Sequence, residues 1–301
     1  MGGETDIKVV TFRNTLNAHQ NNPAATIESK YRVVSPARHV FGLLFGMIIV
    51  HYFLWPGLMI GSLVGLMYFG YWWMSVLLLL CYLPGFLNND HVKNGRPWHS
   101  FRQHPIWSFI QLHLKVELVR EKQLDPAKKY MFGVYPHGIL ILSRPAIYGG
   151  AWEALFPGIE LRTLGATPMF WIPGSRELCL WMGAVDAGKS TALRVLGKYS
   201  MMVYPGGSAE IFLTDPDSKK TTLVARKGFI KLALQTGTDI VPSFVFGEKW
   251  VYKRLHLPKS VQDFFMKTLR LPLIIFWGQW FTWLPFQRPL SVVFGTPIPV
   301  Q

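Results

Sequence analysis

Charged residues are scarce in this sequence. Only 16% of its 301 residues are Asp, Glu, Lys or Arg, whereas 50% are hydrophobic and 15% aromatic. A soluble domain usually carries about a quarter charged residues. Acidic residues are scarcer still, 17 against 31 Lys and Arg, which gives a net charge of +14. The chain therefore has apolar surface beyond the needs of a water-facing core, and its charge suits an anionic partner such as a cytosolic membrane leaflet or a phosphorylated cofactor.

Cysteine is also scarce, and several signatures of chemistry are missing. Only Cys81 and Cys179 occur, and they form no Cys-x-x-Cys pair, so no disulfide framework follows. The sequence has no Gly-x-Ser-x-Gly elbow, no His-Glu-x-x-His and no zinc-ligand spacing, which argues against a serine hydrolase or a metal site. It also lacks zinc-finger, RNP and helix-turn-helix signatures, so we expect no nucleic-acid partner.

Charge is missing altogether between His39 and Asn89. A membrane-spanning helix needs about 20 apolar residues, so this stretch has room for two. We expect spans near Val40–Leu58 and Gly61–Tyr82, with the chain reversing close to Pro56 and Gly57.

Basic residues flank this stretch on both sides. They are Lys30, Arg32 and Arg38 before it, and Lys93, Arg96 and Arg102 after it. Because basic flanks favour the cytosol, residues 30–89 are predicted to form a transmembrane helical hairpin with both ends cytosolic. Residues 1–29 are polar and contain no signal-peptide core, so we expect a disordered cytosolic tail there.

Two features of the hairpin leave alternatives open. The aromatic residues 71–73 would lie in the middle of the second span, which also fits a shorter, re-entrant second limb. Gly57, Gly61 and Gly65 recur every four residues and permit close helix packing. They would serve packing within the hairpin or a homo-oligomer, unless they are simply glycines tolerated in lipid.

From Asp90 onward the pattern is that of an α/β domain, predicted to cover residues 90–301 and to face the cytosol. Buried strands are predicted at residues 130–135, 201–204, 239–246 and 290–294, and helices at 191–196, 225–235 and 260–269. Pro242 places its strand near an edge of the sheet or at a bulge. Residues 271–287 form a second charge-free run with three Trp and two Pro, which indicates an interfacial or tunnel-lining segment.

Two strand ends carry glycine-containing loops with a titratable residue. VYPHGIL places His137 and Gly138 after one predicted strand, and VYPGGSAEIF places Gly206, Gly207 and Glu210 after another. Strand carboxyl ends are where open α/β sheets present their chemistry. His137 suits a general base, Glu210 a carboxylate that orients its imidazole, and the glycines a backbone that reaches a developing oxyanion. The alternatives are a hydrogen-bonded loop histidine and a glutamate that caps the next segment.

A third motif, ARKGFIKLALQTG, begins a helix with separate apolar and basic faces. Phe229 and Leu232 lie on the apolar face. Lys227 and Lys231, four residues apart, lie on the other face, with Arg226 in front of them. This basic end suits phosphate groups, and a solvated basic face is the alternative.

The order and spacing of VYPHGIL, YPGGSAE, ARKGFIKLA and VPSFVFGE resemble those of the type 2 diacylglycerol acyltransferase family, whose relatives acylate monoacylglycerols and fatty alcohols. The resemblance covers residues 30–301. It implies a membrane-anchored, glycerolipid-acyltransferase-like mixed sheet flanked by helices. It also implies an enzyme of the endoplasmic reticulum membrane and lipid droplets, which has no tightly bound cofactor and transfers an acyl group from acyl-CoA to diacylglycerol to make triacylglycerol.

The resemblance also implies roles for single residues. His137 occupies the family's catalytic histidine position, and Glu210 matches the acidic residue of its Gly-Gly-x-x-Glu loop. Many members have His-Pro-His-Gly where this chain has Tyr135, so the base must be His137. More distant glycerolipid acyltransferases carry an Asp at the position of Leu142, which makes Glu210 the better partner.

The same resemblance assigns the third motif to acyl-CoA. Arg226, Gly228 and Phe229 match the family's Arg-x-Gly-Phe motif, and Arg226, Lys227 and Lys231 would hold the CoA phosphates. Monoacylglycerol or a fatty alcohol is the alternative acceptor. A membrane scaffold that binds lipid without catalysis is the alternative from a different class, although it needs no glycine-framed His and Glu.

A further match, GAVDAGKS at residues 183–190, fits the phosphate-loop pattern G-x-x-x-x-G-K-[ST]. A phosphate-loop enzyme also needs a strand that ends in an Asp for Mg²⁺, and the downstream strands end in Tyr-Pro-Gly-Gly and Phe-Gly-Glu instead. Asp186 would also put a negative charge into the phosphate cradle. We interpret the match as a coincidence, with Ser190 as a helix N-cap and Lys189 as a surface or CoA-facing cation.

Overall fold

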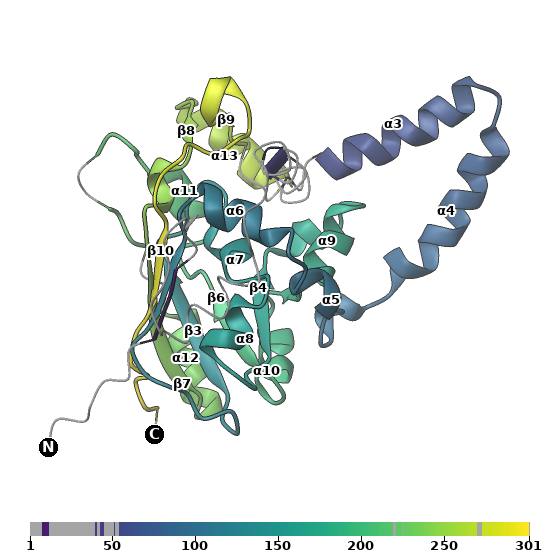
Figure 1. Ribbon diagram of the computed structural model, residues 1–301. Helices are drawn as coiled ribbons and strands as arrows, with labels where there is room; N and C mark the ends of the chain where they lie inside the picture. Colours follow the sequence, from purple (N-terminus) through teal and green to yellow (C-terminus); the bar gives the residue numbers. More distant parts are fainter. Residues whose placement is uncertain are drawn as a thin grey trace, which may run out of the picture.

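The computed structural model describes residues 8–11, 40, 43–44, 51, 54–218, 221–224, 226–269 and 273–300. An α/β body carries one projecting helical arm (Figure 1). The main sheet comprises β1 (Lys8–Thr11), β2 (Glu117–Arg120), β3 (Tyr130–Tyr135), β4 (Leu161–Gly165), β5 (Ala184–Asp186), β6 (Ser200–Val203), β7 (Asp239–Phe246) and β10 (Ser291–Phe294). A second sheet pairs β8 (Lys253–Arg254) with β9 (Phe276–Trp277).

Helices make up about half of the remaining described chain. The α-helices are α3 (Leu54–Tyr68), α4 (Trp72–Leu87), α5 (His99–Arg102), α6 (Trp107–His113), α7 (Ser143–Ala146), α8 (Ala151–Leu155), α9 (Ser175–Trp181), α10 (Lys189–Leu196), α11 (Ser208–Leu213), α12 (Gly228–Thr236) and α13 (Lys259–Leu269). The 3-10 turns are η1 (Asp90–Val92), η2 (Thr167–Phe170), η3 (Glu248–Trp250) and η4 (Gln279–Phe281).

The main sheet is mixed, as the sequence predicts. Its order is β1-β2-β10-β7-β3-β6-β4-β5. The run from β7 to β5 is parallel throughout, whereas β10 is antiparallel to β7 and β1 is antiparallel to β2. The four predicted strands correspond to β3, β6, β7 and β10, and the three predicted helices to α10, α12 and α13. Parallel strands joined by helical crossovers bring their carboxyl ends to one edge of the sheet.

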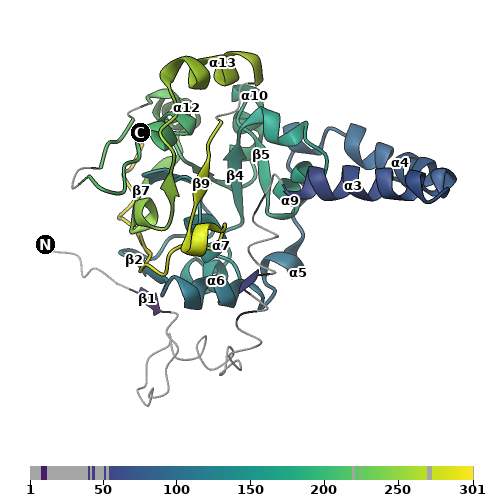
Figure 2. The same ribbon diagram turned by 90° about the horizontal axis from the view of Figure 1, so that it is seen from above.

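The sheet is covered by helices on both faces, with α10 and α12 on one and α6 and α8 on the other (Figures 1 and 2). Successive side chains of a strand point to opposite faces. Met131 of β3 accordingly joins the apolar cluster with α10 and α12, while Phe132 and Val134 join the cluster with α6 and α8. Burial on both faces explains why β3 reads as an uninterrupted apolar strand.

Pro242 lies inside the sheet, so the expectation of an edge strand is wrong. Its strand β7 is paired on both sides, with β3 and with β10. The alternative, a bulge, is confirmed by the pairing register. Ser243 pairs with Phe294, but Ile240, three residues earlier, pairs with Ile298, four residues later. The extra residue lies opposite Pro242, where a missing N–H is tolerated.

Part of the segment expected to be a disordered tail forms β1. Lys8–Thr11 pairs antiparallel with β2, with Val9 opposite Val119. The sequence KVVT has three β-branched residues in a row, which favours an extended strand over a disordered tail. The rest of residues 1–29 lies outside the described residues.

The arm is a helical hairpin of α3 and α4, but its reversal is not where the sequence places it. The chain turns at Phe69–Tyr71, where Gly70 takes a φ of +82°. Pro56 is instead the third residue of α3, in the first turn, where a backbone N–H has no partner within the helix. The aromatic residues 71–73 therefore lie at the tip of the arm and not in the middle of a limb.

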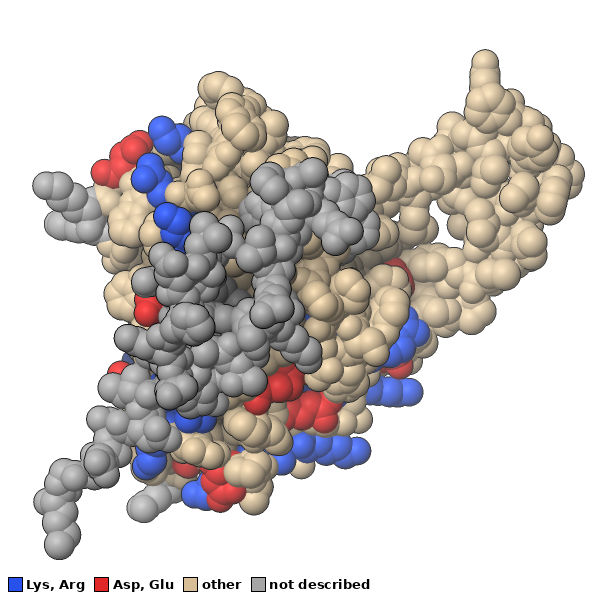
Figure 3. Space-filling model, in the orientation of Figure 1, with Lys and Arg blue, Asp and Glu red and all other residues tan. Residues whose placement is uncertain are grey.

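The arm presents apolar side chains outward. Its surface carries no Lys, Arg, Asp or Glu (Figure 3), and side chains such as Leu77 and Leu80 are 53% and 62% exposed. Gly57, Gly61 and Gly65 have no heavy atom within 4 Å of the position of a Cβ, so α4 does not pack on that face. Most of the predicted first span, Val40–Leu58, lies outside the described residues.

The two limbs have 15 and 16 residues, which corresponds to about 22–24 Å of helix. Within the part of the chain that the structure describes, no helix combines the length and hydrophobicity of a membrane crossing.

Candidate active site

Three neighbouring parallel strands deliver the candidate residues to one edge of the sheet. β3 lies between β7 and β6. His137 follows β3, and Gly206, Gly207 and Glu210 follow β6, so the prediction that these two loops are neighbours is confirmed. Glu248, which begins η3, follows β7 at the same edge.

Glu210 binds the backbone of His137 and not its imidazole. Its side chain is 1% exposed. Oε2 accepts the amide of His137 at 2.7 Å, and Oε1 accepts the amide of Val224 at 2.7 Å. The two residues are brought together as predicted, but the expected contact with the ring is absent between them. Hydrogen bonds from backbone amides to a carboxylate are charge-assisted and therefore strong. Glu210 thus fixes the position of the loop that carries His137.

The imidazole of His137 is oriented by its own loop. Nδ1 lies 2.6 Å from the carbonyl oxygen of Gly138. Because a carbonyl only accepts, Nδ1 carries the proton in the neutral ring, and the lone pair is on Nε2. Nε2 makes no hydrogen bond to another residue of the described chain. Burial lowers the pKa of His137 to about 4, so the ring is neutral at pH 7 and able to accept a proton.

The glycine of the second loop is required by close packing. A Cβ on Gly206 would lie 1.8 Å from Cδ of Glu210 and 2.2 Å from its Oε2. The loop backbone thus lies against the carboxylate, which no other residue type permits. Gly207 donates its amide to the carbonyl of Tyr204 at 3.1 Å, so this N–H is not directed at an oxyanion as the sequence suggested.

Glu248 is the residue that the sequence analysis missed. It is 1% exposed, and its carboxylate accepts the amide of Ser143 at 2.8 Å and the hydroxyl of Ser143 at 3.2 Å. Its Cγ also lies close to Gly138, 2.6 Å from the position that a Cβ would take there. The signal was in the sequence, because VFGE has the same design as the other two loops, a strand followed by glycine and a titratable residue.

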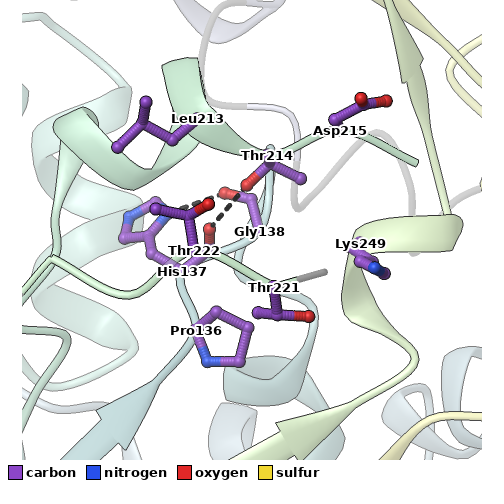
Figure 4. Close-up of a pocket in the computed structure, with 9 residues that line it drawn as sticks. All are labelled: Pro136, His137, Gly138, Leu213, Thr214, Asp215, Thr221, Thr222 and Lys249. Carbon is purple, nitrogen blue, oxygen red and sulfur yellow. Dashed lines mark hydrogen bonds between the residues drawn. The ribbon is translucent and has the colours of Figure 1, made fainter. Parts of the chain in front are cut away.

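A small pocket opens beside the histidine (Figure 4). Its lining comprises Pro136, His137, Gly138, Leu213, Thr214, Asp215, Thr221, Thr222 and Lys249. Most of these side chains are polar, and the hydroxyl of Thr214 lies 3.5 Å from the carbonyl of His137. The pocket therefore places polar side chains beside the loop that carries His137.

Comparison with known proteins decides the family. Residues 65–301 match the family described as diacylglycerol acyltransferase. The chain belongs to this diacylglycerol acyltransferase family. It is 33% identical to human diacylglycerol O-acyltransferase 2-like protein 6, over 77% of this chain and 75% of that protein.

Two other relatives are from mouse. The chain is 31% identical to 2-acylglycerol O-acyltransferase 1, over 80% of this chain and 77% of that protein. It is 32% identical to diacylglycerol O-acyltransferase 2, over 76% and 63%. Among solved structures, the 1-acyl-sn-glycerophosphate acyltransferase of Thermotoga maritima aligns over 87% of this chain and 88% of that one, with 16% identity and a TM-score of 0.41.

In this acyltransferase the third motif begins at the same edge of the sheet. Arg226, Lys227 and Lys231 are exposed. The Arg226 guanidinium is 3.6 Å from the Cβ position of Gly207, which brings it next to the glycine loop. Gly228 is the first residue of α12. Phe229 lies on the side of α12 that faces the sheet, away from these cations. Its ring is 3.1 Å from the Cβ position of Gly133 on β3, so it packs against the sheet.

The phosphate-loop match does not form a phosphate cradle in the acyltransferase. Residues 184–186 within the octamer are themselves the edge strand β5, which a phosphate loop would follow. Asp186 accepts the amide of Gly188 at 2.8 Å and the hydroxyl of Thr167 at 2.5 Å. A carboxylate therefore occupies the turn. The N-cap of α10 is Gly188, so the expectation that Ser190 caps this helix is wrong by two residues.

Proposed function

We propose that this chain transfers a fatty acyl group from acyl-CoA to the free hydroxyl of diacylglycerol, forming triacylglycerol and CoA. The observation that carries the proposal is the histidine of a diacylglycerol acyltransferase family member with Nδ1 occupied and Nε2 unprotonated, beside a polar pocket. A thiolate leaves readily, so the reaction requires neither a metal nor a covalent enzyme intermediate.

His137 is the general base in this proposal. Its Nε2 takes the proton of the acceptor hydroxyl while the hydroxyl oxygen attacks the thioester carbon. The C–O bond forms, the C–S bond breaks, and the proton passes from Nε2 to the departing thiolate of CoA. Because the pKa of His137 is lowered to about 4, the imidazolium is short-lived. Glu210 contributes by holding the histidine loop through its amide.

The apolar arm provides access for lipid in the same proposal. We place residues 54–87 in the lipid of the endoplasmic reticulum membrane or of a lipid droplet, with the basic flanks in the cytosol. The outward apolar side chains of the arm support this. So does the second charge-free run, where Trp280 and Phe281 are 79% and 85% exposed. His51 of the first run stacks on Phe276 of the second and lies at a tilt beside Trp283, so the two runs touch.

An acceptor panel tests the proposed function. Microsomes containing the protein, given labelled acyl-CoA, are expected to form labelled triacylglycerol from added diacylglycerol faster than control microsomes. The 31% identity to a 2-acylglycerol O-acyltransferase makes monoacylglycerol the second candidate acceptor, and a fatty alcohol completes the panel. Faster acylation of monoacylglycerol than of diacylglycerol would show that monoacylglycerol is the acceptor. Absence of transfer to all three would contradict the enzyme and favour the lipid-binding scaffold.

Charge removal at α12 tests the proposed CoA site. The double variant Arg226→Ala/Lys227→Ala is expected to raise KM for acyl-CoA about 5- to 50-fold. Each of the two cations contributes about 1 kcal/mol to the binding of the CoA phosphates, and the variant loses both contributions. Its kcat should change less than twofold. The measurement is initial rate against acyl-CoA concentration at low and high salt, since the effect should shrink as salt screens the charges.

Two exposed lysines at the other edge of the sheet supply the matched control. Lys122 follows β2, and Lys128 precedes β3, at the end of that strand remote from His137. The variant Lys122→Ala/Lys128→Ala loses the same net charge and should keep the KM for acyl-CoA. An equal rise in both double variants would show that the overall charge matters and that α12 is not the phosphate site.

A further inference from the structure

Glu248 contacts the loop that carries His137. It follows strand β7, whereas Glu210 follows β6. The amide of His137 donates to Glu210, and both the amide and the hydroxyl of Ser143, six residues later, donate to Glu248. Two buried carboxylates from the loops after β6 and β7 therefore hold the beginning and the end of the loop after β3.

The fit between Glu248 and the histidine loop is tight. A Cβ on Gly138 would lie 2.6 Å from Cγ of Glu248. The carbonyl of this same Gly138 accepts the proton of Nδ1 of His137. The position of Gly138 thus determines the direction of the imidazole, and Glu248 packs against Gly138.

The residues after Glu248 hold the opposite wall of the pocket. Nζ of Lys249 donates to the carbonyl of Ser218 at 2.8 Å, and Nε1 of Trp250 donates to the carbonyl of Pro216 at 3.1 Å. Further along, Nε of Arg254 donates to the carbonyl of Thr214 at 3.1 Å. One short segment therefore ties the histidine loop to the loop that carries Thr214 and Asp215 of the pocket lining.

We propose that Glu248 is a positioning residue for acyl transfer, which through its bonds to Ser143 and its contact with Gly138 fixes the direction of the imidazole of His137. The inference rests on the proposed function of His137 as the base. Glu248 acts through the loop and not on the substrate, so its loss should lower kcat and leave substrate binding unchanged. Small displacements of a reacting group are enough to cost rate.

The charge of Glu248 supports this role. Burial raises the pKa of Glu248 to about 7, against 4.5 for an ordinary glutamate. Ionising it in the folded chain therefore costs free energy, and its contribution to stability falls as pH rises from 4.5 to 7. The ionised carboxylate accepts both donors of Ser143, one on each oxygen, whereas its protonated form carries a proton on one of those oxygens. The titratable side chain next to Glu248 is that of Tyr204, whose hydroxyl lies 3.2 Å from Oγ of Ser143. Tyr204 also interacts electrostatically with Arg144 and Tyr148.

The test is the isosteric variant Glu248→Gln. Its amide group has one acceptor oxygen and one NH₂ donor in place of two acceptor oxygens, so either the amide or the hydroxyl of Ser143 loses its acceptor. We expect kcat to fall about 10- to 100-fold, with KM for acyl-CoA and for diacylglycerol within twofold of wild type. The melting temperature should not fall, because the variant removes a costly buried charge. The matched control is Glu121→Gln, since Glu121 likewise accepts an amide and a hydroxyl, those of Thr296, far from the pocket; its kcat should be unchanged.

The pH profile separates positioning from a general structural role. Glutamine mimics the protonated carboxyl, so wild-type kcat should fall toward that of Glu248→Gln as pH drops from 8 to 6. The variant itself should stay level over that range. Wild-type kcat in the variant, or a raised KM at unchanged kcat, would overturn the inference.

Two further variants keep the test decisive. If Glu248→Gln does not fold, Ser143→Ala provides the test instead. It removes one hydrogen-bond donor to Glu248 and should lower kcat about threefold or more. An unchanged kcat would refute the inference. Wild-type activity that survives His137→Ala would instead remove the base on which the inference rests, and absence of acyl transfer by the wild-type protein would refute the proposed function, so these failures are distinguishable from failure of the inference.

Discussion

Replacing His137 with alanine is expected to reduce kcat for acyl transfer on the order of 10²–10⁴-fold, the usual contribution of a general base. The physical reason is the loss of Nε2, the nitrogen that the bond from Nδ1 to Gly138 leaves unprotonated. KM for acyl-CoA should change little, because the ring contributes no phosphate contact. The measurement is the initial rate of triacylglycerol formation in microsomes with equal amounts of each variant.

Three comparisons separate chemistry from folding in this experiment. His137→Asn retains a donor for the carbonyl of Gly138 but has no basic nitrogen, so it should be as inactive as the alanine variant. His256→Ala, which changes an exposed histidine away from the pocket, should be fully active. Added imidazole should restore part of the activity of His137→Ala. Near-normal turnover by the alanine or the asparagine variant would show that another group is the base.

The strands of the α/β body were predictable because their burial leaves a clear pattern in the sequence. β3 and β7 were predicted to their exact ends, since runs such as YMFGVY alternate between two buried faces and are bounded by polar or turn residues. The short strands β2, β4 and β5 were not predicted. β5 has three residues, and it lies within an octamer that matches a different motif, so local sequence gave no separate signal for it.

The arm shows the limit of reading composition alone. Absence of charge predicted an apolar hairpin with limbs at residues 40–58 and 61–82, whereas the described hairpin is α3 and α4, whose turn falls inside the predicted second limb. The reversal was misplaced because Pro56 and Gly57 resemble a turn, although proline in the first turn of a helix is compatible with continuation. The turn is made by Gly70, which no neighbouring proline marks, and the aromatic residues beside it were the better indication.

The active site was predictable in its members but not in its bonds. The similar loops after β3 and β6 placed His137 and Glu210 at one edge. Their hydrogen bonds depend on which atoms face one another, and sequence does not specify that. Glu210 and Glu248 both bind peptide groups, so the carboxylates shape the loop and the loop orients the ring.

Gly206→Ala is expected to give the second large loss, because the new methyl group has no room. Its Cβ would lie 1.8 Å from Cδ of Glu210. Glu210 cannot turn away without breaking its bonds to the amides of His137 and Val224. We expect kcat to fall about 100-fold as the histidine loop shifts. Overpacking should also lower the free energy of unfolding by about 1–3 kcal/mol, measured by tryptophan fluorescence on heating in detergent.

Two further variants show whether the clash with Glu210 is the cause. Gly197→Ala adds the same methyl group where the nearest atom outside the neighbouring residues, the carbonyl oxygen of Arg194, is 3.4 Å away, so kcat and stability should stay at wild-type values. Gly206→Ala/Glu210→Ala removes the group that clashes and should regain part of the stability. It should remain inactive, because the amide of His137 then lacks the acceptor that fixes the loop. Full activity in the double variant would mean that Glu210 does not position the base, and full activity in Gly206→Ala alone would mean that the loop tolerates displacement.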